Sequence, residues 1–284
     1  MSSRPFRFGL VAAVPPRGAT WADQARQAES LGYASLQVPD TLATLGVFPA
    51  LAAAAAVTDT LRVCSYVLAV TNHHPAAVAH QALTLDVLSN GRLELGLGAG
   101  RPDAEREADQ LGVPFGTPGE RMDRLRATIA AVRARCAAPS GPLQPVQRPH
   151  PPILIAAAGT RMLRLAAAEA DIVALGLPIE STEDVLAAKT AELRGYAGDR
   201  ADQLEIALNL AVVGEEPTPW LAGMIGADPD RLRAIGAVSA IVGTPAEMAD
   251  TLRRRRDRTG VSYVQVNGMF AEKFAPVVEL LAGT

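Results

Sequence analysis

The amino-acid sequence predicts a single (β/α)8 barrel domain across residues 1–284, with a helical insert late in the chain. Short β-like runs alternate with helical patterns roughly eight times, which indicates parallel strands joined by helices. About eight such units in 284 residues favour a closed barrel over an open, doubly wound sheet. No Gly-x-Gly-x-x-Gly sequence follows the first run, which argues against a dinucleotide-binding sheet.

The first half of the chain contains four predicted strands, each followed by a helix with apolar residues at helical spacing. Thr20 is a candidate N-cap and Gly32 a candidate C-cap of the first helix, and Pro75 suits a first helical turn. The predicted strands are 6–13, 34–38, 61–67 and 92–98, and the helices are 21–31, 47–58, 75–88 and 122–136.

The second half repeats the alternation after a proline-rich connector at 139–152. The segment 101–118 is expected to be a loop long enough to act as a lid, and 214–240 is expected to be an irregular helical insert. The predicted strands are 153–156, 171–176, 204–213 and 263–266, and the helices are 160–170, 181–196, 244–259 and one that starts at 270.

Composition excludes several classes of protein. A hydrophobic fraction of 49% and a net charge of −3 predict a soluble globular chain without a basic footprint for nucleic acid. The longest apolar run, 49–57, is shorter than the roughly 20 residues of a membrane helix, and the N-terminus lacks the apolar core of a secretory signal. Two cysteines and four histidines predict neither a disulfide framework nor a metal site. We expect a cytoplasmic protein with a small-molecule substrate.

The sequences at the predicted strand ends carry a family resemblance. They are VPDT (38–41), 61–100, LGVPF (111–115), GERMDRL (119–125), 151–171 and VGTPAEMADTLRR (242–254). Together they resemble the bacterial luciferase-like family of flavin- and deazaflavin-dependent oxidoreductases, and the block 61–100 is the most specific. The resemblance implies a barrel that binds coenzyme F420 or FMN, and a homodimer.

The fourth predicted strand alternates leucine with smaller or polar residues. Leu93, Leu95 and Leu97 are expected to face the surrounding helices, which leaves Gly96 and Gly98 pointing into the barrel. Missing side chains there would open space for a flat tricyclic ring. The alternative is that these glycines only relieve crowding at a barrel corner.

The third predicted strand matches a bulge in the deazaflavin-using relatives. By alignment the bulge lies at Ser65, Tyr66 and Val67, with a non-proline cis peptide at Tyr66–Val67 that backs the cofactor ring. The alternative is an ordinary strand with Tyr66 packed in the barrel. The Thr71–Asn72 step resembles one that borders F420 in several members, and His74 is a candidate substrate contact that is equally typical of a solvated loop.

An anion site is expected where the fifth strand leads into its helix. Ala157, Ala158, Gly159 and Thr160 precede or begin this helix, whose free N–H groups suit a phosphate, and Arg161 adds a positive charge. Relatives usually have a run of glycines here, whereas this chain keeps one, and a simply capped helix is the alternative. Further candidates for the pocket lining are Gly98, Ala99, Gly100 and Gly176.

Asp40 is the candidate catalytic group and a candidate cofactor contact. Many relatives have Asp-His at this position, and in the deazaflavin-dependent sugar-phosphate dehydrogenases of the family this histidine is the proposed base. Here Thr41 replaces it and Arg101 follows Gly100, which argues against that alcohol-oxidising mechanism. A carboxylate can act as a base if it is partly desolvated, whereas a threonine cannot near neutral pH. The alternative for Asp40 is a turn carboxylate that holds its loop by accepting from backbone amides. Thr41 and Arg101 are candidate substrate contacts, although a surface cluster with Asp103, Glu105 and Glu107 would also explain Arg101.

These residues support three functions. The leading hypothesis is an F420-dependent oxidoreductase that transfers a hydride between the deazaflavin and a small organic substrate. The first alternative is an FMN-dependent monooxygenase, and the second is a barrel that binds a flavin without turnover. In both enzyme classes the cofactor carries the redox chemistry, while the protein orients and shields it.

Overall fold

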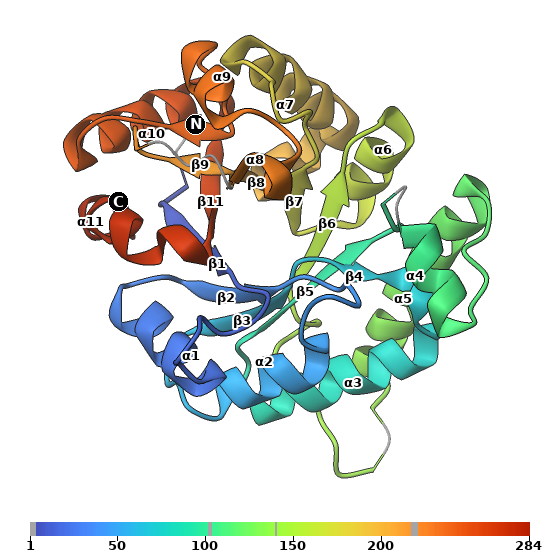
Figure 1. Ribbon diagram of the computed structural model, residues 1–284. Helices are drawn as coiled ribbons and strands as arrows, with labels where there is room; N and C mark the ends of the chain where they lie inside the picture. Colours follow the sequence, from blue (N-terminus) through green and yellow to red (C-terminus); the bar gives the residue numbers. More distant parts are fainter. Residues whose placement is uncertain (1–3, 102–103, 140, 217–220) are drawn as a thin grey trace.

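The barrel is closed, and its strands pair in parallel throughout the described residues (Figure 1). The computed structural model describes residues 4–101, 104–139, 141–216 and 221–284. Neighbouring strands follow the order β3-β2-β1-β11-β8-β7-β6-β5-β4, and pairing of β3 with β5 closes the ring. The strands are β1 (Arg7–Val11), β2 (Ser35–Val38), β3 (Arg62–Ser65), β4 (Leu68–Ala69), β5 (Leu93–Gly98), β6 (Ile153–Ala157), β7 (Ile172–Leu175), β8 (Glu205–Leu210) and β11 (Val261–Asn267).

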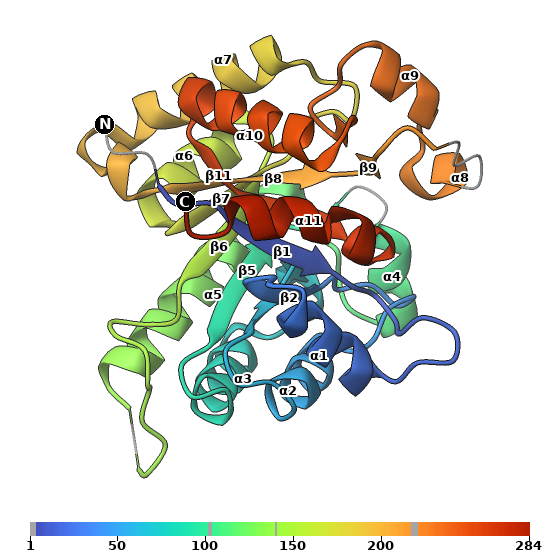
Figure 2. The ribbon, with the colours of Figure 1, turned by 90° about the vertical axis from the view of Figure 1, so that its left-hand side faces the viewer.

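Helices surround the barrel (Figures 1 and 2). The predicted N-cap Thr20 forms a capping box with Asp23, and Gly32 adopts a φ of +80° directly after the C-cap. The main helices are α1 (Trp21–Ser30), α2 (Val47–Ala55), α3 (Pro75–Leu88), α5 (Pro118–Ala137), α6 (Thr160–Glu169), α7 (Glu183–Ala197), α10 (Pro245–Thr259) and α11 (Ala271–Leu281), with 3-10 turns η1 (Val70–Asn72), η2 (Gly198–Gln203) and η3 (Gly268–Phe270).

Two segments differ from the sequence-based expectation, and the late insert agrees with it. The predicted loop 101–118 contains α4 (Ala104–Leu111), whose buried Ala104 and Ala108 lie one helical turn apart and pack inward. The predicted strand 204–213 divides into β8 and β9 (Val212–Val213), and β9 pairs with β10 (Ala240–Ile241) outside the barrel. The insert 214–240 contains α8 (Leu221–Ile225) and α9 (Pro229–Ala234). Residues 102–103 and 217–220, which belong to the predicted lid and insert, lie outside the described residues.

The predicted bulge interrupts the third strand. The expected strand 61–67 is interrupted between β3 and β4, and both pieces pair with β5. Cys64 is opposite Glu94 and Leu68 is opposite Leu97, so four steps on one strand correspond to three on the other. One extra residue in a strand is the definition of a β-bulge. The bulge predicted from the resemblance is therefore present.

Apolar side chains form one layer outside the sheet and a smaller group inside it. Leu93, Leu95 and Leu97 are buried in the outer layer, as the alternation predicted. The interior group combines Cys64 and Tyr263 with small and aliphatic residues from β6, β7 and β8. Within the described ranges, no helix is both long and apolar enough to cross a bilayer.

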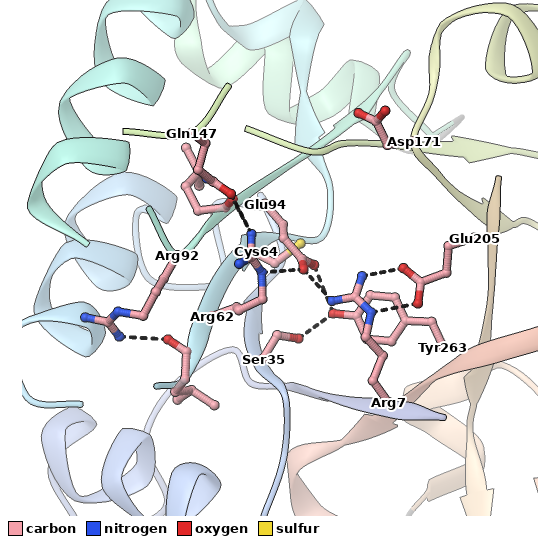
Figure 3. Close-up of polar contacts among 12 residues, drawn as sticks. Arg7, Ser35, Arg62, Cys64, Arg92, Glu94, Gln147, Asp171, Glu205 and Tyr263 are labelled. Atoms are coloured by element: carbon pink, nitrogen blue, oxygen red, sulfur yellow. Dashed lines mark hydrogen bonds and ion pairs between the residues drawn. The ribbon is translucent and has the colours of Figure 1, made fainter. Parts of the chain in front are cut away.

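The amino ends of the strands enclose a cluster of charged residues inside the barrel (Figure 3). Glu94, which is 1% exposed, forms ion pairs with Arg7 and Arg62, and the Arg62 Nε–Glu94 Oε1 distance is 2.7 Å. Arg7 also pairs with Glu205 and lies 3.8 Å from the centre of the Tyr263 ring. The Tyr263 hydroxyl donates to the other Glu94 oxygen at 3.1 Å. Each acidic group in this cluster therefore has a cationic partner.

The guanidinium groups keep the buried carboxylate ionised. Burial by itself raises the pKa of Glu94, but the charges of Arg7 and Arg62 outweigh burial and hold this pKa below its usual value. Burial and the Glu94 charge raise the pKa of Tyr263 well above its usual value, so the phenol stays protonated and can donate. The cluster lies at the end of a (β/α)8 barrel that typically contributes stability rather than catalysis.

Candidate active site

A pocket of about 450 Å³ opens at the carboxyl ends of the strands. This is the end at which (β/α)8 barrels carry their active sites. Most of the lining side chains are small and uncharged, so the backbone forms much of the wall. The lining consists of Pro39, Asp40, Thr41, Tyr66, Val67, Ala69, Gly98, Ala99, Gly100, Arg101, Ala104, Ala156, Ala157, Ala158, Met162 and Gly176.

The bulge between β3 and β4 forms one wall of the pocket. The Tyr66–Val67 peptide bond is cis, as predicted, and both side chains line the pocket. Ser65 is buried behind the bulge, where its hydroxyl donates to the Gly96 carbonyl at 2.8 Å and accepts from the Gly96 amide at 2.9 Å. Ser65 therefore attaches the bulge to β5 and does not line the pocket.

The glycines of β5 fit the alternative interpretation, in which they relieve crowding. A Cβ atom on Gly96 would lie 1.9 Å from the Ser65 carbonyl oxygen, and one on Gly98 would lie 2.7 Å from Val67 Cγ2. The bulge itself thus fills the space that the missing side chains leave. The prediction that Gly96 opens space for a ring is wrong, because the adjacent backbone already occupies that space. Gly98 still contributes to the lining.

Polar side chains lie beneath this wall, inside the barrel. The Tyr66 hydroxyl is 3.5 Å from Gln265 Oε1, and burial raises the pKa of Tyr66, so its phenol is uncharged. Gln37 donates through Nε2 to Tyr263 at 2.8 Å. Gln265 Nε2 and Gln37 Oε1 are buried without a hydrogen-bond partner among the described residues. The barrel below the pocket therefore contains polar side chains beside its apolar interior group.

Asp40 reaches the pocket from the segment after β2. Its Oδ2 atom accepts from the Ala69 amide at 2.9 Å and lies 2.8 Å from His73 Nε2. Asp40 therefore connects the β2 segment to β4 and η1, as a turn carboxylate would, while it also lines the pocket. The predicted contacts Thr41 and Arg101 lie in the same lining.

Arg101 also fits its alternative interpretation, which is a surface cluster with the acidic residues that follow it. Its NH2 atom pairs with Glu107 on α4 at 2.7 Å, and the side chain is half exposed. The surface pairing expected for Arg101 is therefore formed, at the rim of the pocket. Asp103, which was named as part of that cluster, lies outside the described residues.

The amino end of α6 lies next to the pocket. Ala157 and Ala158 line it, and the N-cap Gly159 provides no side-chain cap for the helix. Thr160 is exposed, with its hydroxyl 3.5 Å from Glu192. Arg161 lines a separate groove of about 480 Å³ between α5 and α6. The structure thus places the first-turn amides of α6 next to the pocket, whereas Arg161 lines the groove between α5 and α6.

The predicted site residues that follow the bulge in the sequence do not line the barrel-mouth pocket. Thr71, Asn72 and His74 line a second cavity of about 610 Å³, which we call the outer cavity, together with residues of α5. His74 is exposed and caps α3, since its Nδ1 accepts from the Ala76 amide at 3.3 Å. Thr71 is buried against Gly100. These three side chains are not part of the barrel-mouth lining, and their predicted roles stay predictions.

Sequence reasoning did not name several lining residues. Pro39, Ala69 and Ala156 lie at strand ends, a position that could have suggested them once the strand bounds were fixed. Ala104 and Met162 come from the first turns of α4 and α6. No sequence signal distinguishes these two from ordinary core residues. Across the described part of the chain, no three His, Cys, Asp or Glu side chains gather as a metal site.

Comparison with known proteins identifies the family. The model of the luciferase-like monooxygenase family matches residues 5–218. This match covers most of the barrel, including the bulge, the β5 glycines and the amino end of α6. The chain therefore belongs to the luciferase-like monooxygenase family, whose members and structural neighbours are oxidoreductases and monooxygenases.

Two relatives show how far the sequence similarity extends. An uncharacterized protein of Mycobacterium tuberculosis is 33% identical over 194 residues, which is 54% of this chain and 66% of that protein. The alignment thus covers slightly less than two thirds of that relative. The F420-dependent glucose-6-phosphate dehydrogenase of Beutenbergia cavernae is 39% identical over 116 residues, or 38% of this chain and 34% of that enzyme.

Solved structures confirm the fold over the whole chain. The coenzyme F420-dependent tetrahydromethanopterin reductase of Methanopyrus kandleri has a TM-score of 0.73 at 18% identity, with 99% of each chain covered. The monooxygenase RslO1 of Streptomyces bottropensis has a TM-score of 0.70 at 22% identity, covering 96% of this chain and 97% of that one. At these identities the likeness shows the shared (β/α)8 barrel fold alone.

Proposed function

We propose that the protein is an F420-dependent oxidoreductase that transfers a hydride between the deazaflavin and a small organic substrate. The observation that carries the proposal is the barrel-mouth pocket, bounded by the Tyr66–Val67 bulge on one side and the amino end of α6 on the other. F420 is preferred over FMN because the named relative with 39% identity over its aligned region is F420-dependent.

The pocket residues fit a planar cofactor with an anionic tail. A volume of about 450 Å³ lies within the usual range of small-molecule pockets, and the small side chains at Gly98, Ala99 and Ala156 leave flat walls. The α6 amides lack a side-chain cap and lie at a helix end that favours negative charge. Such a cofactor supplies the two-electron hydride step when it is bound.

The protein residues would then divide into two groups. Tyr66 and Val67 support the ring, while the α6 amides next to Ala158 hold the phosphate. Asp40 and Arg101 lie at the substrate side, where they provide a carboxylate and a cation for a polar group of the substrate. We further propose that the active form is a homodimer.

An FMN-dependent monooxygenase is the second candidate. The family model is described as a monooxygenase, and RslO1 shares the fold at a comparable TM-score. Both cofactors need a planar pocket and a phosphate site, so the geometry supports either. The two candidates differ in which cofactor binds.

A binding titration tests the proposal. Purified protein is titrated separately with F420 and with FMN, and cofactor fluorescence is followed. We expect F420 to bind with a micromolar or lower Kd. The variant Ala158→Phe should weaken binding at least tenfold, because its ring would fill the pocket. The exposed Ala130→Phe on α5 is the matched control, since Ala130 is outside the pocket lining and should leave the Kd unchanged.

Each outcome of the titration decides the proposal. Binding of FMN without F420 would replace the leading function by the monooxygenase. Failure of both cofactors to bind at micromolar concentrations would reject both candidates. An unchanged Kd for F420 in Ala158→Phe would show that the cofactor ring lies elsewhere.

A further inference from the structure

A small cavity lies between the late insert and helices α7 and α10, on the side of the barrel where α7, α9 and α10 come together (Figures 1 and 2). Its volume is about 170 Å³. Pockets for cofactors and drug-sized ligands usually begin at roughly 300 Å³, so this cavity suits a small ion rather than a flavin. We call it the insert cavity, and its lining consists of Glu183, Leu232, Arg233, Gly236, Ala237, Ala240, Ile241, Val242, Thr251 and Arg255.

The lining of the insert cavity carries more positive than negative charge. Arg255 on α10 is 3% exposed, and the side chain of Arg233 on α9 is 11% exposed. Glu183, the first residue of α7, is the single acidic residue among the described residues of the lining. Its half-exposed carboxylate is divided between two arginines, because it lies 3.4 Å from Arg255 Nε and 3.9 Å from Arg258. The buried guanidinium of Arg255 therefore has only a share of one carboxylate.

The hydrogen bonds of Arg255 are also incomplete. NH1 donates to the Val238 carbonyl at 3.1 Å, and the contact of Nε with Glu183 is long. NH2 donates to no described residue, and it is not one of the fully buried atoms that lack a partner, so it opens onto the cavity that Arg255 lines. Burial lowers the pKa of Arg255, and the charge of Glu183 does not offset this effect. A buried cation in this condition is stabilised by an anion that binds beside it.

Two further side chains of the lining suit an anion. The Thr251 hydroxyl accepts a hydrogen bond from Arg254 at 2.9 Å, so its own proton can be donated into the cavity. Arg233 donates to two backbone carbonyls and pairs with the exposed Asp230, so it contributes charge rather than a free donor. The rest of the lining is apolar, which strengthens the attraction between these groups and an anion.

We propose that the insert cavity is a binding site for a small oxyanion of the inorganic phosphate type, held by Arg255 and Thr251. A guanidinium presents paired donors that match the oxygens of such an ion. The anion takes the place of Glu183 as the partner of Arg255, while Glu183 stays with Arg258 at the surface. None of the lining residues belongs to the barrel-mouth pocket, so this inference does not rest on the proposed function.

A bound anion would also strengthen the connection between the insert and the segment that follows β7. Arg255 holds the Val238 carbonyl, and the Val238 amide donates to the Ser181 carbonyl at 2.8 Å. The segment that contains Ser181 begins at Gly176, which lines the barrel-mouth pocket. Occupancy of the insert cavity should therefore reduce local opening around Val238.

Calorimetric titration with inorganic phosphate at fixed ionic strength tests the site. We expect the wild type to bind with a Kd of about 1 mM or below. Arg255→Lys keeps the charge but loses the paired donors, so it should weaken binding at least about fivefold. Arg253→Lys on the exposed face of α10 is the matched control and should stay within about twofold of the wild type. Absence of binding to the wild type, or equal Kd values in the wild type and Arg255→Lys, would overturn the proposal.

Glu183 gives a prediction of the opposite sign. Glu183→Gln removes the carboxylate that competes with the anion for Arg255, so it should tighten phosphate binding about threefold or more. The exposed Glu279→Gln on α11 removes the same charge away from the cavity and should leave the Kd within about twofold. An ion pair with a purely structural role predicts no gain in affinity. Unchanged or weaker binding in Glu183→Gln would contradict the proposal, and this result decides even if Arg255→Lys fails to fold.

Hydrogen exchange measured by mass spectrometry locates the bound phosphate. Saturating phosphate should slow amide exchange at residues 236–241, and this protection should be lost in Arg255→Lys. Phosphate can also bind at the amides that begin α6. Protection confined to residues 157–163 would therefore assign the ion to the barrel-mouth pocket, which would overturn this inference and leave the proposed function standing.

Discussion

The two ends of the barrel interior are built from the same strands but have opposite chemistry. At the amino end, Arg7, Arg62, Glu94 and Glu205 fill the interior with ion pairs (Figure 3). At the carboxyl end, most of the lining is glycine, alanine and backbone. Strand β5 shows the contrast within six residues, since Glu94 lies in the charged cluster and Gly98 lines the pocket.

This difference separates the part that stabilises the barrel from the part that can hold a ligand. Buried ion pairs are costly to break singly, so the charged cluster tolerates little change. Small residues at the mouth contribute little packing energy but leave volume. The bulge at Tyr66–Val67 lies between these two regions, attached to β5 by Ser65. Substitutions in the three places should therefore have different effects.

The largest effect is expected at the charged cluster. Glu94→Gln removes the negative charge that faces Arg7 and Arg62 and should lower the free energy of unfolding by about 3 kcal/mol. Urea denaturation monitored by circular dichroism measures the loss. The exposed Glu279→Gln on α11 is the matched control and should remain within about 0.5 kcal/mol of the wild type. A loss below about 1 kcal/mol for Glu94→Gln would show that the cluster does not stabilise the barrel.

An intermediate effect is expected at the bulge. Gly96→Ala places a methyl group against the Ser65 carbonyl, so it should lower the free energy of unfolding by about 1–3 kcal/mol and weaken F420 binding by displacing Tyr66–Val67. Gly195→Ala in α7 is the control, because a Cβ there meets no atom within 4 Å. That change should stabilise the protein by about 0.5–1 kcal/mol. The same sign for both variants would contradict the close approach at Gly96.

The smallest effect concerns pH. The pKa of Glu94 is lower in the folded protein than its usual value of 4.5, so its contribution to stability is complete above about pH 4.5 and is lost as pH falls through the folded pKa. The free energy of unfolding should fall between pH 5 and pH 3 more steeply for the wild type than for Glu94→Gln. Parallel pH curves for the two proteins would refute this assignment.

The fold could be predicted from the sequence because its signals are local. Leucine alternation on β5 and the capping residue Thr20 each depend on neighbours within a few positions. The exceptions depend on distant contacts. α4 was expected to be a loop because its helical pattern is short and polar, and its two buried alanines gave no apolar stripe. The division of 204–213 depends on pairing with β10, which lies 27 residues or more away.

Only part of the candidate site could be predicted from the sequence, because only part of it depends on local signals. Tyr66 and Val67 were predicted from the resemblance to deazaflavin-using relatives, and Ala158 because it follows a predicted strand; all three lie in the pocket. The role of Gly96 could not be predicted from the sequence, because it depends on the Ser65 carbonyl group of another strand. The contact between Asp40 and His73 spans 33 positions and requires the turn after β4, so sequence spacing alone does not reveal it.

A crystal structure of the protein with bound F420 tests the central claim most directly. We predict that the deazaflavin ring lies against Tyr66 and Val67 in the barrel mouth, with its phosphate at the amides that begin α6. A ring bound instead in the outer cavity beside Asn72 and His74, with the mouth free of cofactor, would contradict the account.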